Sequence, residues 1–352
     1  MSGRIHLKDQ FGNDLYFGHA GDVWMPLFPH IPDFRQHLQD IRHLELRPDD
    51  IIIAGYPKSG FHWNHEIVHM LVHGAPEYVG TSGFGEFFDA NLAASILPPV
   101  KPRIFFTHFK FHHLPQQMRE KGVKLIYLTR NPKDLWVSLY NHVVHDVLTS
   151  KYDGTWSHFF ELMMQVGYWY GDWFDYVLGW EKEIEANSDH PILVSNFEDL
   201  KKVAADSLKQ VEKINEFLGL KRSKELCAKI AQACEFPSLK KAKDDQTTEE
   251  VRKMLWKDNA PGFYRKAPGS PASARTPPHA TPEPPPAPWP ISLLSKAIIS
   301  SILLSRLVIL LLRRASMLAS CSTTSLRLGS AVEDLVPGLP ASLPVVLSLV
   351  CQ

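Results

Sequence analysis

The chain has 352 residues, enough for one large α/β domain with an appendage, and its 38 Lys and Arg residues balance its 38 Asp and Glu residues. With 44% hydrophobic and 22% charged residues, the composition is that of an ordinary globular protein and excludes a bulk basic attraction to nucleic acid. Any anionic ligand must therefore be held by a local site.

The first clear predicted element is a strand at residues 50–56, DIIIAGY, which is a β-branched apolar run. The loop PKSG follows, and the pattern WNHEIVHMLVHG predicts a helix that stops at Gly74. Residues 103–107 and 123–130 predict two further short strands. Pro132 is well suited to the first turn of a helix over 131–148.

The last predicted strand lies in HPILVSNF, and Asp199 stands near the start of a helix that extends through 211–220. Strands that alternate with helices predict an α/β fold, a single domain with a central, mostly parallel sheet flanked by helices on both faces. In such sheets the ligand site lies at the carboxyl ends of the strands.

The far end of the chain differs in composition from the rest. Residues 267–290 hold many of the 27 prolines and predict an extended linker. The Ser- and Leu-rich tail 291–352 is predicted to be poorly ordered, with membrane contact as an alternative because 291–312 is apolar apart from one Lys and one Arg. The expected domain is 1–266, in which 1–29 form an N-terminal segment, with a place on the acceptor side as one interpretation.

The cellular setting is indicated by the cysteines and by the start of the chain. Only four cysteines occur, and the first ten residues contain no apolar stretch resembling a secretory signal. A cytoplasmic protein without structural disulfides is therefore expected.

The loop Tyr56-Pro57-Lys58-Ser59-Gly60 has the features of a phosphate site. A glycine permits a tight turn after a buried strand, backbone N–H groups point outward, and a helix amino terminus adds positive potential. The spacing is not GxxxxGK[ST], because the lysine precedes the glycine, so hydrolysis of a nucleoside triphosphate is not predicted.

The full string YPKSGxxW resembles the 5′-phosphosulfate loop of the cytosolic sulfotransferases, and the resemblance covers roughly residues 30–266. It implies a P-loop-like fold and metal-free transfer of a sulfuryl group from 3′-phosphoadenosine 5′-phosphosulfate to a hydroxyl or amine of a small acceptor. Further motifs in the same order support it: Thr107-His108, LPQ (114–116), RNPKDLWVSLY (130–140), YGDWFDYVLGWE (170–181), FEDLKK (197–202) and FYRK (263–266).

The resemblance implies two catalytic residues. Lys58 would stabilise the leaving phosphate, with Ser59 restraining the lysine before the acceptor arrives. His108 would act as the general base that takes the acceptor proton, a role that suits a group titrating near neutral pH.

The resemblance also implies the contacts of the donor. Arg130 and Ser138 would hold the 3′-phosphate, for which a guanidinium offers bidentate donors and a serine a hydroxyl. The remaining expected donor contacts come from the loop and from residues distant in sequence: Gly60, Phe61, His62, Trp63, Phe197, Phe236, Arg265 and Lys266. Among these, Trp63 and Phe236 are expected to sandwich the adenine, with core packing as the alternative.

Several positions depart from the family pattern. Phe106 stands where the family often has a lysine before TH, with Lys110 as a candidate replacement. Phe197 replaces a tyrosine, and Ala267 replaces the glycine of RKGxxGxWK, after which the phosphate clamp and the dimerisation motif are missing. A catalytically impaired nucleotide-binding or membrane-tethered protein is therefore the alternative function, and a monomer or weak dimer is expected.

A second alternative concerns metal binding. Histidines 62, 65, 69 and 73 recur at helical spacing, which could indicate a metal site. One helix presents at most two of them well to one ion, so no metal is predicted there.

Overall fold

The computed structural model describes residues 3–79, 86–96, 102–201, 204–258 and 260, all of which belong to the unit Met1–Arg275. The predicted contacts Arg265 and Lys266, the linker 267–290 and the tail 291–352 lie outside the described residues. In the part of the chain that is described, no helix is long and apolar enough to cross a membrane.

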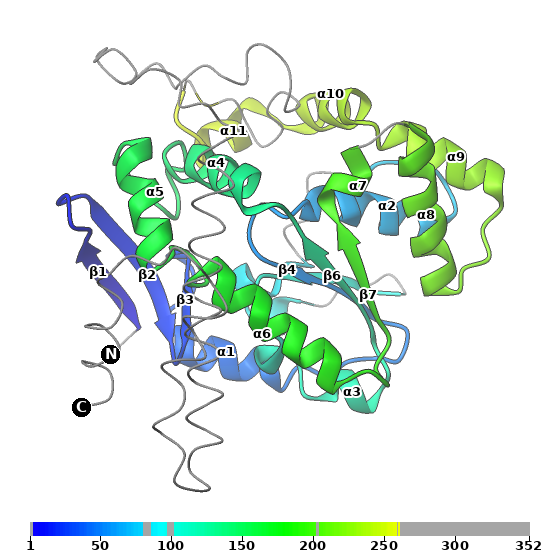
Figure 1. The fold of residues 1–352 in the computed structure, drawn as a ribbon, viewed down its shortest axis with the longest axis horizontal. Helices are drawn as coiled ribbons and strands as arrows, with labels where there is room; N and C mark the ends of the chain where they lie inside the picture. Colours follow the sequence, from blue (N-terminus) through cyan, green and yellow to red (C-terminus); the bar gives the residue numbers. More distant parts are fainter. Residues whose placement is uncertain (1–2, 80–85, 97–101, 202–203, 259, 261–352) are drawn as a thin grey trace, which may run out of the picture. The chain divides into compact units, whose positions relative to one another are not determined.

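A four-stranded parallel sheet forms the centre of this unit (Figure 1). Its strands are β4 (Ile51–Gly55), β5 (Ile104–Thr107), β6 (Lys124–Thr129) and β7 (Ile192–Asn196), in the spatial order β5-β4-β6-β7. Every residue of β4 and β5 is buried, as their continuous apolar runs require of strands covered on both faces. The predicted α/β fold with a mostly parallel sheet is confirmed. Because β4 pairs with β5 on one side and β6 on the other, the loop after β4 lies where the strand order reverses.

Helices cover both faces of the sheet. Helix α2 (Phe61–His73) packs on β4 and β5, while α6 (Trp173–Ala186) lies on the other side (Figure 1). The remaining helices are α1 (Phe34–Arg42), α3 (Gln117–Glu120), α4 (Pro132–Val143), α5 (Trp156–Gln165), α7 (Phe197–Lys201), α8 (Ala204–Leu218), α9 (Lys224–Ala233), α10 (Phe236–Gln246) and α11 (Glu249–Leu255), with short 3₁₀ turns η2 (Phe88–Ala90), η3 (Ala93–Ser95) and η4 (Phe111–His113).

Helix α4 ends earlier than its sequence pattern predicts. Asn131 caps its start and Pro132 occupies the first turn, as expected, but the helix stops at Val143. The carboxylate of Asp146 accepts hydrogen bonds from the backbone N–H groups of Leu148 and Thr149, at 2.7 Å and 3.1 Å. Because these N–H groups bond to the Asp146 side chain, the backbone forms a non-helical turn after Val143 and the helix does not continue.

The N-terminal segment contains an antiparallel sheet that the sequence did not indicate. Strand β2 (Asp14–Ala20) pairs with β1 (Arg4–Lys8) and with β3 (Val23–Met25). Strand β2 packs on helix α1, where Phe34 is fully buried and its ring lies against Gly18. Residues 3–25 therefore belong to the folded unit.

A buried ion pair joins the starts of β4 and β5. The Nε of Arg103 donates to Oδ1 of Asp50 at 2.7 Å, and Nη2 of the same arginine donates to the backbone carbonyl of Glu45 at 3.0 Å. The next backbone group, N–H of Ile51, donates to the carbonyl of Arg103 at 2.9 Å. Both charged side chains are almost completely buried. This pair thus fixes the register in which the two strands begin.

Candidate active site

The loop after β4 holds an unusual backbone conformation. Lys58 has φ 69°, a left-handed conformation that is uncommon for a residue with a side chain, and Gly60 has φ 100°. A Cβ on Gly60 would lie 2.6 Å from the Phe197 ring, so both the conformation and the close approach require glycine. Gly60 also caps α2 without a side-chain hydrogen bond to the first turn. The N–H groups of that turn thereby suit an anion.

Ser59 supports this interpretation with a polar atom that lacks a protein partner. Its side chain is buried, and its Oγ has no hydrogen-bond partner among the described residues. A buried hydroxyl without a partner is costly, by about 1–3 kcal/mol, and is usually explained by a ligand or water. The loop therefore fits a phosphate or sulfate oxygen at this position.

Arg130 follows β6 and lies against the same loop. Its Nη1 donates to the carbonyl of Lys58 at 2.6 Å, and its guanidinium carbon lies 4.1 Å from the centroid of the Phe197 ring. The ends of β4 and β6 are neighbours in the sheet, which is why residues 72 apart in sequence meet here. Ser138 is half-buried in α4, the helix that Arg130 precedes.

Three aromatic residues expected at the donor site come together. The ring of Trp63, in the first turn of α2, lies 5.7 Å from the Phe197 ring and 6.2 Å from the Phe236 ring, between centroids. Phe197 begins α7 and Phe236 begins α10, so the group joins three helix starts. The half-buried Phe236 leaves an aromatic surface on which a planar base can stack.

His108 follows β5 and bonds to the end of β4. Its Nδ1 lies 3.0 Å from the carbonyl of Gly55, and its backbone N–H donates to the carboxylate of Asp89 at 2.9 Å. A carbonyl only accepts, so Nδ1 carries the hydrogen and Nε2 keeps its lone pair. The ring is edge-on to Phe61 and Phe87, at 4.4 Å and 5.2 Å between centroids.

The electrostatic surroundings keep His108 neutral. Burial is the main reason that the pKa of His108 falls to about 3, and the charge of Lys58 lowers it further. The imidazole is therefore a proton acceptor at neutral pH. An anion that offsets the charge of Lys58 would raise the pKa of His108 toward the range in which a general base works best.

Asp89 is a component of the site that sequence reasoning missed. Its fully buried carboxylate accepts hydrogen bonds from Oγ1 of Thr107, at 2.5 Å, and from the N–H of His108. Burial raises the pKa of Asp89 to about 7, although these hydrogen bonds and the phenol of Tyr170 oppose the rise. The signal was an acid directly after two phenylalanines in GEFFDA, but its partners are visible only in the fold.

Aromatic packing occupies the position where the family often has a lysine. Phe106 stacks on Phe87 with a centroid distance of 4.8 Å and lies 6.2 Å from Phe61. The candidate replacement, Lys110, has its Nζ 3.4 Å from Oδ2 of Asp22. In this structure the Lys110 ammonium thus pairs with Asp22, and its role as the replacement cation stays a prediction.

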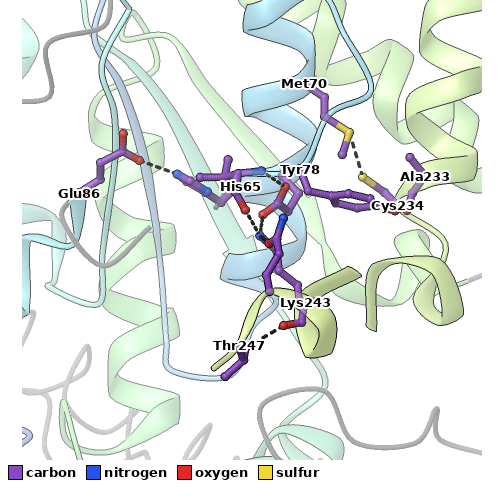
Figure 2. Close-up of polar contacts among 11 residues, drawn as sticks. His65, Met70, Tyr78, Glu86, Ala233, Cys234, Lys243 and Thr247 are labelled. Atoms are coloured by element: carbon purple, nitrogen blue, oxygen red, sulfur yellow. Dashed lines mark hydrogen bonds and ion pairs between the residues drawn. The ribbon is translucent and has the colours of Figure 1, made fainter. Parts of the chain in front are cut away.

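Polar contacts join α2 to other segments of the chain (Figure 2). The Nε2 of His65 lies 2.7 Å from Oε2 of Glu86, and Lys243 of α10 forms a buried ion pair with Glu66. In the described ranges, the histidines of α2 are not among the groups that bring three metal-ligand atoms together. The alternative of a metal site on this helix is therefore not supported.

A fall in pH is expected to destabilise the fold through three histidines near the site. Burial lowers the pKa to about 3 for His62 and His108 and to about 4 for His69, so below pH 6.5 the unfolded chain binds protons that the folded chain does not. Each should cost about 2 kcal/mol of unfolding free energy between pH 7 and pH 5. The raised pKa of Asp89 acts in the opposite direction by a similar amount, so the net effect is a loss.

Urea unfolding at pH 7 and pH 5 measures this loss, and His62→Gln should make it smaller by about 2 kcal/mol. Equal unfolding free energies at the two pH values would contradict the assignment of neutral histidines in the folded chain.

Comparisons with known proteins agree with this geometry. A family model described as a sulfotransferase domain matches residues 48–271. Sulfotransferase 1A1 of Mus musculus is 32% identical over 223 residues, which cover 60% of this chain and 74% of that protein. Sulfotransferase 1B1 of Canis lupus familiaris is 33% identical over 224 residues, covering 60% and 73%.

Solved structures show the same fold. The mouse sulfotransferase SULT7A1 complexed with PAP matches with a TM-score of 0.51 and 27% identity, covering 63% of this chain and 74% of that one. A retinol dehydratase solved with androsterone and the inactive cofactor PAP matches with a TM-score of 0.53 at 22% identity, covering 75% and 82%, which supports the fold alone.

Proposed function

The chain belongs to the sulfotransferase family, and we propose that it moves the sulfuryl group of 3′-phosphoadenosine 5′-phosphosulfate to a hydroxyl or amine of a small acceptor. It is accordingly an enzyme that depends on this donor. The observation that carries the proposal is the convergence of the Lys58 loop, His108 and Arg130 at the carboxyl ends of three adjacent strands.

When bound, the donor supplies an activated sulfuryl group on a phosphate leaving group. The backbone N–H groups from Gly60 to Trp63 and the Ser59 hydroxyl would hold the 5′ end, while Arg130 and Ser138 would hold the 3′-phosphate. Trp63, Phe197 and Phe236 would contact the adenine. Arg265 and Lys266 are proposed as further phosphate contacts from the sequence alone.

Lys58 and His108 would act on the two sides of the reacting centre. The ammonium of Lys58 would stabilise the negative charge that grows on the leaving oxygen. His108 would take the acceptor proton at Nε2, because Nδ1 is already committed to the Gly55 carbonyl. Phe61, Phe87 and Tyr170 surround the imidazole, so the acceptor would meet apolar and aromatic surface beside the base.

A catalytically impaired, nucleotide-binding form is the second candidate function. Phe106 favours it, because this residue stands where the family often has a lysine that would add a positive charge at the transition state. Its ring packs instead against Phe87 and Phe61. The sequence after Lys266 favours it as well, since the usual clamp is replaced there. For the rest of the chain we propose a domain over 1–266, a cytoplasmic location and a monomer or weak dimer.

Calorimetric titration of residues 1–352 with 3′-phosphoadenosine 5′-phosphate, the donor product, tests the proposal without an acceptor. We expect a Kd in the micromolar range or below, and a 10- to 100-fold weaker Kd for Lys58→Met, because a charge-assisted contact contributes about 1.5–3 kcal/mol. Lys182→Met, on the exposed side of α6, is the matched control and should bind as the wild type. No binding by a folded wild-type chain would refute the donor site.

A further inference from the structure

A cluster of two histidines and one aspartate lies on residues that the transfer does not use. Asp22 stands in the turn between β2 and β3, and His112 and His113 lie in η4, after the segment that begins at His108. The Nε2 atoms of His113 and His112 lie 2.6 Å from Oδ1 and 3.3 Å from Oδ2 of Asp22. Two distant segments thus bring three possible metal ligands within 4.8 Å of one another.

The donor set and its spacing suit a divalent transition metal. Zn²⁺ commonly takes imidazole nitrogens at about 2.0–2.1 Å and carboxylate oxygens at similar distances, so neighbouring ligand atoms lie about 3.3 Å apart in a tetrahedron. The two observed separations, 2.6 Å and 3.3 Å, need only small side-chain rotations to reach this value. Asp22 and His112 are about half exposed, which leaves room for water as a further ligand.

The atoms that would bind an ion already face one another. The Nε2 atoms of His112 and His113 both lie at the carboxylate of Asp22. An ion would displace the protons that the imidazoles share with the carboxylate, as metal binding ordinarily does.

We propose that Asp22, His112 and His113 form a binding site for a divalent transition-metal ion, with Zn²⁺ the best match to the ligands. The ion would tie the turn of the N-terminal sheet to the segment that follows the proposed base. It would act as a structural clamp, since donor binding and proton transfer are assigned to other residues.

Two cations near the cluster limit its affinity. The Nζ of Lys110 lies 3.4 Å from Oδ2 of Asp22, and the charge of Arg42 acts on His113. Removing the lysine charge should therefore tighten metal binding several-fold, because a unit charge a few ångströms from a divalent ion repels it even when water screens the pair. Lys110→Met provides a variant whose effect is opposite in sign to loss of a ligand.

Two titrations of the full chain test the site. Binding of ZnCl₂ is measured by calorimetry, and binding of Co²⁺ is measured by its visible absorption. We expect one site that is weakened at least about tenfold in His112→Ala, since even outer-shell changes cost 10- to 100-fold, and tightened in Lys110→Met. His112 is exposed enough for its replacement to leave the fold intact. A Zn²⁺-dependent rise in Tm should occur in the wild type and be absent from His112→Ala.

His6→Ala is the matched control. His6 lies 2.7 Å from Asp14 and Lys8 lies 2.9 Å from the same carboxylate, which repeats the arrangement without a second imidazole. This variant should bind Zn²⁺ as the wild type does. If His112→Ala binds Zn²⁺ as tightly as the wild type, which is the result expected if the histidines of α2 bind the ion, the proposal is overturned. It is also overturned if His6→Ala loses as much Zn²⁺ affinity as His112→Ala. The titration with 3′-phosphoadenosine 5′-phosphate, which tests the proposed function, does not depend on the result of these metal titrations.

Discussion

Replacement of His108 by alanine is expected to lower kcat by about 10²- to 10⁴-fold, the contribution of a positioned general base. The side chain that is removed carries the Nε2 lone pair, because its Nδ1–H is bonded to the Gly55 carbonyl. Turnover is measured with labelled 3′-phosphoadenosine 5′-phosphosulfate and a panel of small acceptors that includes 2-naphthol, an aliphatic alcohol and an arylamine.

The affinity for 3′-phosphoadenosine 5′-phosphate should change little in this variant, because no donor contact is assigned to His108. His43→Ala, which removes an exposed histidine at the end of α1, is the control and should keep full activity. A His108→Ala enzyme that retains half of the wild-type kcat would exclude this residue as the base.

Replacement of Asp50 by alanine is expected to lower the unfolding free energy by about 3–5 kcal/mol, since Arg103 would keep a buried charge without its partner. The loss is a large fraction of the stability of an ordinary domain, which is about 5–15 kcal/mol. It should appear as a much lower midpoint of urea unfolding for the variant.

Asp49→Ala provides a neighbouring control, because Asp49 is exposed and should change stability by less than about 0.5 kcal/mol. The double variant Asp50→Ala with Arg103→Leu should recover a large part of the loss, since no charge then remains buried. If Asp50→Ala were as stable as Asp49→Ala, the ion pair would not hold the two strands in register.

The parallel sheet could be predicted because its strands have a strong local signal. Runs such as Ile51-Ile52-Ile53 are β-branched and buried on both faces, so burial and local preference agree. The N-terminal strands lack this agreement, because β1 is mostly exposed and β3 has only three residues. The central strand β2 also packs on α1, and a local pattern does not contain that contact.

The site was partly predictable for a similar reason. The Lys58 loop is continuous in sequence, and in the structure Arg130, Trp63, Phe197 and Phe236 lie near it and one another. Asp89 escaped notice because an acid beside two phenylalanines indicates no role until its partners are known. Local sequence therefore identifies the phosphate-binding loop at Lys58 more readily than the buried carboxylate of Asp89, which bonds to the backbone of His108.

The bond between His108 and the Gly55 carbonyl has a consequence for how acceptor choice can diverge. The proposed base, His108, follows β5, and the proposed leaving-group cation, Lys58, follows β4. These two strands are paired, and backbone hydrogen bonds set their separation at about 4.8 Å. Substitutions among the aromatic side chains around His108 can therefore change the surface beside the proposed base while the spacing of the two strands stays constant. A scaffold of this kind allows new substrates to be adopted without rebuilding the reaction centre.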